Sequence, residues 1–426
     1  MDSWSTLRDG LCTGSMDERL AEVYGRAAVP FQRERLQALM DAYAGIFGKS
    51  GAVGLFSGPG RTEMGGNHTD HQHGCVLAAA IDLDAAACAG ANGSAVVHIV
   101  SEGYPDVTVD LGELAPRPDE RESSAALVRG VAARMAELGF APGGFNACVS
   151  SNVLGGSGLS SSAAYEVLIG VIFNHLFCGD ALSMVQIAQI GQFAENRYFG
   201  KPCGLMDQLT SAVGGVVSID FADTDAPIVQ KVVCDPAEYG YALCIIDSGA
   251  SHMDLTDEYA AIPGEMGAVA AHFGKRWLRE VDEAAFRREL PAVRAAAGDR
   301  AVLRAMHFFA DNALAPKQAL ALRQGDFETF LAFVNSSGRS SALQLQNLSC
   351  SDSPNRQAIP IALACAGHIL CGRGAVRVHG GGFAGTVQAY VPLDMAPAFR
   401  AGMEAVLGVG CCHFLRIRSV GGAVLA

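Results

Sequence analysis

The sequence predicts a protein of mixed α/β or α+β layers that is divided into two domains. Helical patterns such as Ala125–Leu138 alternate with short β-rich runs at Ala52–Phe56, Val96–Val100, Val107–Leu111 and Phe145–Val149. Such alternation is typical of helices packed on sheets. At ~100–200 residues per domain, 426 residues predict two domains or one large one. Because 50% of the residues are hydrophobic and 18% are charged, the chain can bury sizeable cores.

The first glycine-rich motif, SGPGRTEMGGNHTDHQHG, covers residues 57–74 and follows the first strand. It holds Arg61, His68, Asp70, His71 and His73 within thirteen residues. Side chains of these types exchange hydrogen bonds with hydroxyl groups, so the motif favours a polyhydroxylated ligand. A metal site is the main alternative, but His71 and His73 would point to opposite faces of a strand.

The second motif, NVLGGSGLSSSAA, covers residues 152–164 and joins a strand to a helical pattern. A glycine loop that leads into a helix N-terminus presents free N–H groups to an anion such as phosphate. The serine hydroxyls there could also bind Mg²⁺. Taken alone, the motif favours the simpler interpretation of a serine cap after a flexible turn. It lacks the lysine of a Walker A loop.

Two acidic residues follow on predicted helices. Ser183 and Gln186 form a possible capping box for a helix that reaches about Asn196, so Glu195 lies near its C-terminal end. A negative charge there opposes the helix dipole unless a cation or another partner offsets it. Asp207 stands among apolar neighbours in GLMDQLTS and must either face water or have a partner.

A domain boundary is expected near residue 225, which gives domains of residues 1–225 and 226–426. The tract ADTDAPIVQ after Asp220 is interpreted as a loop. A strand at Ala242–Asp247 then precedes a strongly helical stretch from about Glu258 to Phe333.

The third glycine motif, HGGGFAG at residues 379–385, contains a GxGxxG match. A dinucleotide-binding site would need a helix after it, yet TVQAYV alternates as a strand does. AVRV before it alternates too. The pattern therefore predicts two strands joined by a glycine loop.

Charge, cysteines and hydropathy exclude several function classes. The 44 acidic residues exceed the 31 basic ones, for a net charge of −13, so we expect no nucleic-acid partner. The 13 cysteines form no CxxC pair and have mostly apolar neighbours, which indicates reduced thiols in a cytoplasmic protein without a zinc site. No signal peptide is expected, and no segment reaches the ~20 apolar residues of a membrane span.

Taken together and in order, the motifs resemble those of the galactokinase family, within the superfamily named for galactokinase, homoserine, mevalonate and phosphomevalonate kinases (GHMP kinases). GPGRTEMGGNHTDHQHGCVLAAAI is similar to its amino-terminal signature, GLSSSAA to its phosphate loop, and CGLMDQLTS to its catalytic-aspartate segment. RAMHFFADN and VHGGGFAGTVQAYV are similar to its later segments. The resemblance spans roughly residues 50–391.

The resemblance implies a two-domain GHMP kinase fold with the active site in the interdomain cleft. It implies catalytic roles for Arg61 and Asp207, with Asp207 facing the sugar's anomeric hydroxyl. Ser162 and Glu195 would hold Mg²⁺, and Gly380 to Gly382 would help shape the pocket. The sugar would contact Asn67, His68, Asp70, Asp207 and Tyr259. The ATP phosphates would lie against Gly155, Gly156, Ser157, Gly158, Leu159, Ser160, Ser161 and Ser162.

The implied reaction is transfer of the γ-phosphoryl group of ATP to the C1 hydroxyl of α-D-galactose, with no obligate protein partner. This chain departs from the family at Asn67, where galactokinases usually have Glu, and at Glu63, where Asn is usual. The family's Glu is expected to accept a hydrogen bond from the sugar's 6-hydroxyl. A related sugar 1-kinase such as galacturonate kinase therefore stays open, and so does a non-catalytic sensor that binds galactose and ATP.

Overall fold

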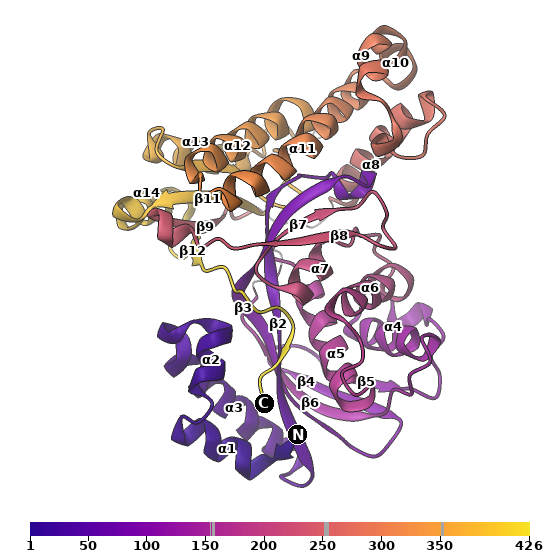
Figure 1. Cartoon of the computed structure of the whole chain (residues 1–426), viewed down its shortest axis with the longest axis vertical. Coiled ribbons are helices and arrows are strands. Elements are labelled where there is room, and N and C mark those ends of the chain that lie inside the picture. Colours follow the sequence, from indigo (N-terminus) through magenta and orange to yellow (C-terminus); the bar gives the residue numbers. More distant parts are fainter. Residues whose placement is uncertain (154, 156–157, 251–254, 351–352) are drawn as a thin grey trace.

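The computed structural model describes the chain except for residues 154, 156–157, 251–254 and 351–352. Within the described residues, nine strands form one sheet and four strands form a second (Figure 1). Helices pack on both sheets, so the mixed helix and sheet fold is confirmed. The first sheet contains β1 (Asp2–Ser3), β2 (Ala52–Gly65), β3 (Cys75–Ala91), β4 (Val96–Ser101), β5 (Val107–Asp110), β6 (Phe145–Ser151), β7 (Val216–Asp220), β8 (Ile228–Val232) and β13 (Ala423–Val424).

The long antiparallel pair β2–β3 runs through the first sheet. One half of β3 pairs with β6 and the other half pairs with β7. β4 lies parallel to β6, and the other pairs in this sheet are antiparallel. The mostly apolar sequence VLAAAIDLDAAACAGA, residues 76–91, thus lies in the central strand β3.

Helices cover both faces of this sheet. α1 (Trp4–Thr13), α2 (Asp17–Tyr24) and α3 (Val29–Phe47) lie on one face (Figure 1). Leu55 packs with them, whereas its neighbour Phe56 packs with the helices of the other face, as the alternation of side chains along a strand requires. The helices of that other face are α4 (Ser124–Glu137), α5 (Ser161–Phe177), α6 (Met184–Ala194) and α7 (Met206–Val213).

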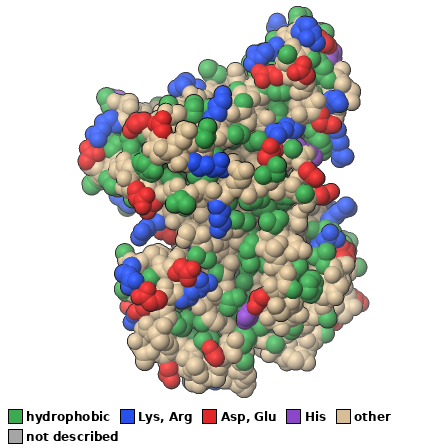
Figure 2. Space-filling view, in the orientation of Figure 1, with side chains coloured by type: hydrophobic (Ala, Val, Ile, Leu, Met, Phe, Trp, Pro, Cys, Tyr) green, Lys and Arg blue, Asp and Glu red, His purple; other side chains and the backbone are tan. Residues whose placement is uncertain are grey.

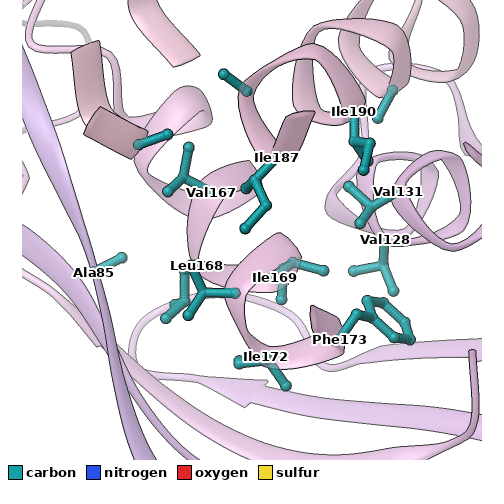
Figure 3. Close-up of a cluster of buried hydrophobic side chains, with 14 of the residues drawn as sticks. Ala85, Val128, Val131, Val167, Leu168, Ile169, Ile172, Phe173, Ile187 and Ile190 are labelled. Carbon is teal, nitrogen blue, oxygen red and sulfur yellow. The ribbon is translucent and has the colours of Figure 1, made fainter. Parts of the chain in front are cut away.

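α5 lies at the centre of the largest hydrophobic cluster. Its Val167, Leu168 and Ile169 are fully buried and point in different directions, toward the sheet and toward α4 and α6 (Figure 3). A helix that is apolar on all sides is stable only when it is enclosed, as α5 is here. The helix that the phosphate-loop motif predicts is therefore anchored by the core of the first sheet.

The second sheet is antiparallel and contains β9 (Tyr241–Asp247), β10 (Ala375–Val378), β11 (Thr386–Pro392) and β12 (Cys412–Leu415). β10 and β11 are the two strands predicted around the third glycine motif. Beside this sheet lie α11 (Asp299–Arg323), α12 (Phe327–Ser340), α13 (Ala358–Leu370) and α14 (Ala396–Leu407). α8 (Thr256–His272) and α10 (Leu290–Ala297) pack against α11 farther from the sheet, and α9 (Glu283–Arg288) packs against α10 (Figure 1).

The two halves of the chain are interleaved near the expected boundary. β8 follows residue 225 but pairs with β7 in the first sheet, and β13 returns to pair with β2. The boundary at residue 225 stays a prediction. Among the described residues, no helix is both long and apolar enough to cross a membrane. On the face seen in Figure 2, acidic and basic side chains are interspersed.

Candidate active site

An ion pair between Arg61 and Asp207 joins the first glycine motif to the start of α7. Nε and Nη2 of Arg61 each lie 2.7 Å from one carboxylate oxygen of Asp207. The Ser160 hydroxyl donates to the same carboxylate. Burial alone would raise the pKa of Asp207, but Arg61 and Ser160 outweigh it and lower the pKa, so the carboxylate is ionised at neutral pH. Its side chain remains 30% exposed and is open to a ligand.

The phosphate-loop motif reaches this ion pair at the N-terminus of α5. Gly158 and Ser160 adopt the left-handed region, with φ of 71° and 58°. The carbonyl groups of Gly158 and Leu159 accept hydrogen bonds from Arg61. Of the residues expected to bind ATP, Gly155 and Gly158 to Ser162 are described, whereas Gly156 and Ser157 lie outside the described residues.

Ser162 and Glu195 lie together, as the magnesium interpretation requires. The Ser162 hydroxyl donates to Glu195 across 3.2 Å. The predicted capping box at the start of α6 is present, and Glu195 follows the helix as the first residue of a π-helical segment, Glu195–Phe199. A hydroxyl and a carboxylate are hard oxygen donors of the kind that Mg²⁺ prefers. Among the described residues, no group of three or more His, Cys, Asp or Glu is placed to hold a metal.

The charge of Glu195 has partners that the sequence did not reveal. Lys201 Nζ lies 3.5 Å from Glu195, and Gln208 Nε2 donates to it across 2.7 Å. Gln208 also donates to the buried Glu166 across 2.9 Å. Burial and the nearby Glu195 raise the pKa of Glu166 well above its usual value. In the sequence, only the position of Gln208 directly after Asp207 could have suggested that it belongs to the site.

His68 and Tyr259 face the glycine loop between β10 and β11. His68 Nε2 lies 2.9 Å from the Gly381 carbonyl oxygen, and Tyr259 donates to the Gly382 carbonyl oxygen across 3.0 Å. Burial lowers the pKa of His68 to about 3, so the ring is neutral and can donate to that carbonyl. The first glycine motif is therefore brought against the third.

Asp70 lies on the Asp207 side of the site. A Cβ atom added to Gly204 would come within 2.0 Å of the Asp70 carboxylate, so this glycine allows the acid to approach the loop before α7. Asp70–Gln72 is a 3-10 turn. The expectation that His71 and His73 lie on a strand is therefore wrong, because Gly66 and Gly74 flank a tight turn between β2 and β3.

Asn67 is fully buried, so its side chain does not lie at the surface where a sugar would bind. Its amide lies 3.1 Å from Glu63 and 2.7 Å from the Gly380 carbonyl oxygen. Glu63 in turn forms a buried ion pair with Arg377 of β10. Arg377 was not predicted as a site residue; in the sequence it is marked only as a cation inside the alternating run AVRV.

Two family models match parts of the chain. The N-terminal domain of GHMP kinases matches residues 126–215, and the galactokinase galactose-binding signature matches residues 41–91. These ranges include α5 and the first glycine motif, respectively.

Solved kinases share the fold. Lactococcus lactis galactokinase, determined with galactose, is 24% identical with a TM-score of 0.78, and the alignment covers 91% of this chain and 99% of that one. A D-glycero-D-manno-heptose 1-phosphate kinase from Bacteriodes thetaiotaomicron is 16% identical with a TM-score of 0.59, covering 88% and 98%. L. major mevalonate kinase, determined with R-mevalonate, is 12% identical with a TM-score of 0.58, covering 87% and 97%.

Proposed function

Because the GHMP kinase and galactokinase family models both match this chain, we propose that it is a galactokinase, which transfers the γ-phosphoryl group of ATP to the C1 hydroxyl of α-D-galactose. The products are galactose 1-phosphate, ADP and the proton of the hydroxyl. The observation that carries this proposal is the Arg61–Asp207 ion pair, which lies directly beside the phosphate-loop helix α5.

Asp207 is assigned to the anomeric hydroxyl. Its carboxylate is ionised and partly exposed, so it can accept a hydrogen bond from that hydroxyl and receive or polarise its proton. Arg61 fixes the orientation of the carboxylate through two parallel hydrogen bonds and places a positive charge where negative charge develops. Catalysis of phosphoryl transfer consists mostly of such positioning and charge stabilisation.

The phosphates of ATP are assigned to the loop from Gly155 to Ser161 and the N-terminus of α5. The free N–H groups of that helix end favour an anion. Ser162 and Glu195 supply hard oxygen atoms for Mg²⁺, which when bound neutralises charge on the phosphates. The hydrogen bond from Gln208 and the ion pair with Lys201 would orient the Glu195 carboxylate.

Sugar hydroxyls are assigned to His68 and Asp70 of the first glycine motif and to Tyr259 of α8, which contacts the third glycine motif. The Tyr259 hydroxyl donates to the Gly382 carbonyl oxygen, at the loop of the third glycine motif. We place the enzyme in the cytoplasm, because ATP is its co-substrate and cysteines such as Cys88 and Cys244 are reduced thiols.

A coupled assay of ADP release, run with galactose, galacturonate and glucose, tests the proposal. We expect ADP only when sugar is added, the highest kcat/KM with galactose, and a phosphate on C1 by NMR. A higher kcat/KM with galacturonate would make the chain a galacturonate kinase. Sugar and ATP binding without ADP release would make it a sensor.

A further inference from the structure

The side chain of Asn67 has no hydrogen-bonding capacity left for a sugar. Its amide nitrogen lies 3.1 Å from the Glu63 carboxylate and 2.7 Å from the Gly380 carbonyl oxygen. Its amide oxygen accepts from Asn347 across 2.9 Å and from Ser341 across 3.3 Å. A primary amide has two donor hydrogens and two acceptor positions, and all four are engaged.

These contacts hold the loop Gly380–Gly382 at each of its carbonyl groups. The oxygen of Gly380 accepts from Asn67, that of Gly381 from His68 and Asn347, and that of Gly382 from Tyr259. The backbone N–H of Phe383 then donates to the Asn347 carbonyl oxygen across 2.6 Å. Asn67 and His68 therefore fasten a loop of the second sheet to the first glycine motif.

We infer that Asn67 is a positioning residue for the Gly380–Gly382 loop rather than a sugar ligand, and that it forms a coupled acid–amide pair with Glu63. The assignment of the loop to the sugar site rests on the proposed function, whereas the coupling rests on geometry alone. The pair explains why this chain carries Glu at 63 and Asn at 67, the reverse of the order usual in galactokinases.

Charge compensation is the physical reason for the coupling. Glu63 is 3% exposed and Arg377 is fully buried, and together they form one carboxylate–guanidinium pair. A second carboxylate at position 67 would lie against Glu63 in the same dry space, where like charges repel strongly. Exchanging both residues keeps one acid and one amide and so keeps the charge balance.

Four proteins test the coupling: the native enzyme, Asn67→Glu, Glu63→Asn and the double variant. Hydrogen–deuterium exchange at residues 379–386 reports the loop, and residues 96–101 of β4 report global opening. We expect the loop amides of each single variant to exchange at least about fivefold faster than those of the native enzyme. In the double variant, the exchange rate should return most of the way to the native value. If the fold-increase in loop exchange of the double variant equals the product of the two single-variant increases, the coupling is overturned.

A second experiment separates positioning from sugar contact. Asn67→Ser should lower kcat/KM for galactose and for 6-deoxygalactose by the same factor, because a loosened loop affects both sugars. A loss at least about tenfold larger for galactose would show that Asn67 contacts the 6-hydroxyl and would overturn the inference. Asn347→Ser should give the same pattern as Asn67→Ser.

Asn174→Ser is the matched control, since Asn174 is also buried and bonds to the backbone of Leu182, within the first half of the chain. It should leave exchange in the loop unchanged. If the native protein phosphorylates neither sugar, the proposed function fails, and the exchange experiment still decides the positioning role because it needs no substrate.

Discussion

Asp207 keeps a negative charge in a largely buried position because Arg61 and Ser160 replace the water that it loses. The Arg61 guanidinium binds both of its carboxylate oxygens, and this geometry fixes the acid as well as its charge. Hydrogen bonds from Arg61 and Ser160 therefore offset the desolvation of the Asp207 carboxylate and also fix its orientation. Under the proposed function, catalysis and stability would depend on the same ion pair.

Asp207→Asn should lower kcat by about 100-fold, because the amide keeps the size of the side chain but can no longer receive a proton or carry charge. A sugar-dependent ADP-release assay measures the loss, and sugar binding by calorimetry should change little. Asp106→Asn, at an exposed position, is the control with unchanged kcat. Near-native turnover in Asp207→Asn would remove this residue from the mechanism.

Glu195→Gln should raise the Mg²⁺ concentration for half-maximal rate by about tenfold, because a neutral amide is a weaker ligand for a hard cation than a carboxylate. A titration of Mg²⁺ at fixed ATP measures the shift. Glu137→Gln removes an exposed carboxylate from α4 and should leave the titration unchanged. An unchanged titration in Glu195→Gln would mean that this residue only supports the end of α6.

At the scale of elements, α5 lies unusually close to β2 because a glycine stands at the contact. A Cβ atom on Gly58 would come within 2.3 Å of the Ala164 carbonyl oxygen and 2.9 Å of the Leu168 nitrogen. Both are backbone atoms of the helix and cannot turn aside. This close contact sets the distance between the phosphate-loop helix and Arg61 on the same strand.

Gly58→Ala should lower the free energy of unfolding by about 1–3 kcal/mol, because α5 must move away from β2 to make room for the methyl group. Urea denaturation measures the change. Gly264→Ala is the control, since its Cβ atom meets nothing within 4 Å on an exposed part of α8. Gly264→Ala should be neutral or stabilising. An equal effect of the two substitutions would contradict the close-packing argument.

Local signals in the sequence predicted local structure well. The capping box at Ser183 and Gln186 and the two strands around the third glycine motif are confirmed, because each depends on residues close in the chain. The helices α1 to α3 were not predicted, although buried Leu36, Leu39, Met40 and Tyr43 recur at helical spacing in α3.

Partners that are far apart in the chain could not be predicted. Glu63 and Arg377 meet across 314 positions, and Asn67 and Asn347 meet across 280. Nothing in the residues near Asn67 shows that its amide is already engaged. The sequence therefore led to a sugar contact there, and that role stays a prediction that the structure gives reason to replace.

At the scale of the whole molecule, Asp84 joins segments from both ends of the chain. This fully buried carboxylate of β3 accepts a hydrogen bond from Tyr24 of α2 across 2.6 Å and is paired with Arg35 of α3. Ser57 of β2 also donates to it, and Arg418, just before β13, lies 3.3 Å away. One acid thus links the amino-terminal helices, the central sheet and the returning carboxy-terminal segment.

Asp84→Asn should destabilise the protein at pH 7 by about 3–5 kcal/mol, because it leaves two buried guanidinium groups with too little negative charge. Burial would raise the pKa of Asp84, but Arg35 and Arg418 outweigh it, so the folded-state pKa lies below the usual value. A depressed carboxylate pKa stabilises the fold above the unfolded-state pKa of about 3.9, and this contribution is lost as the pH falls through the folded-state value.

The native protein should therefore lose stability below about pH 4 with a contribution from Asp84 of up to about 1.4 kcal/mol per pH unit. Asp84→Asn should lack that contribution, so its stability should fall less steeply in the same range. Urea denaturation at pH 7, 5, 4 and 3 measures both effects, and the exposed Asp106→Asn should follow the native curve. Removing the Asp84 carboxylate must also remove its proton uptake. If the unfolding free energy of Asp84→Asn falls with pH as steeply as that of the native protein, Asp84 does not contribute to the pH dependence as an ionised carboxylate.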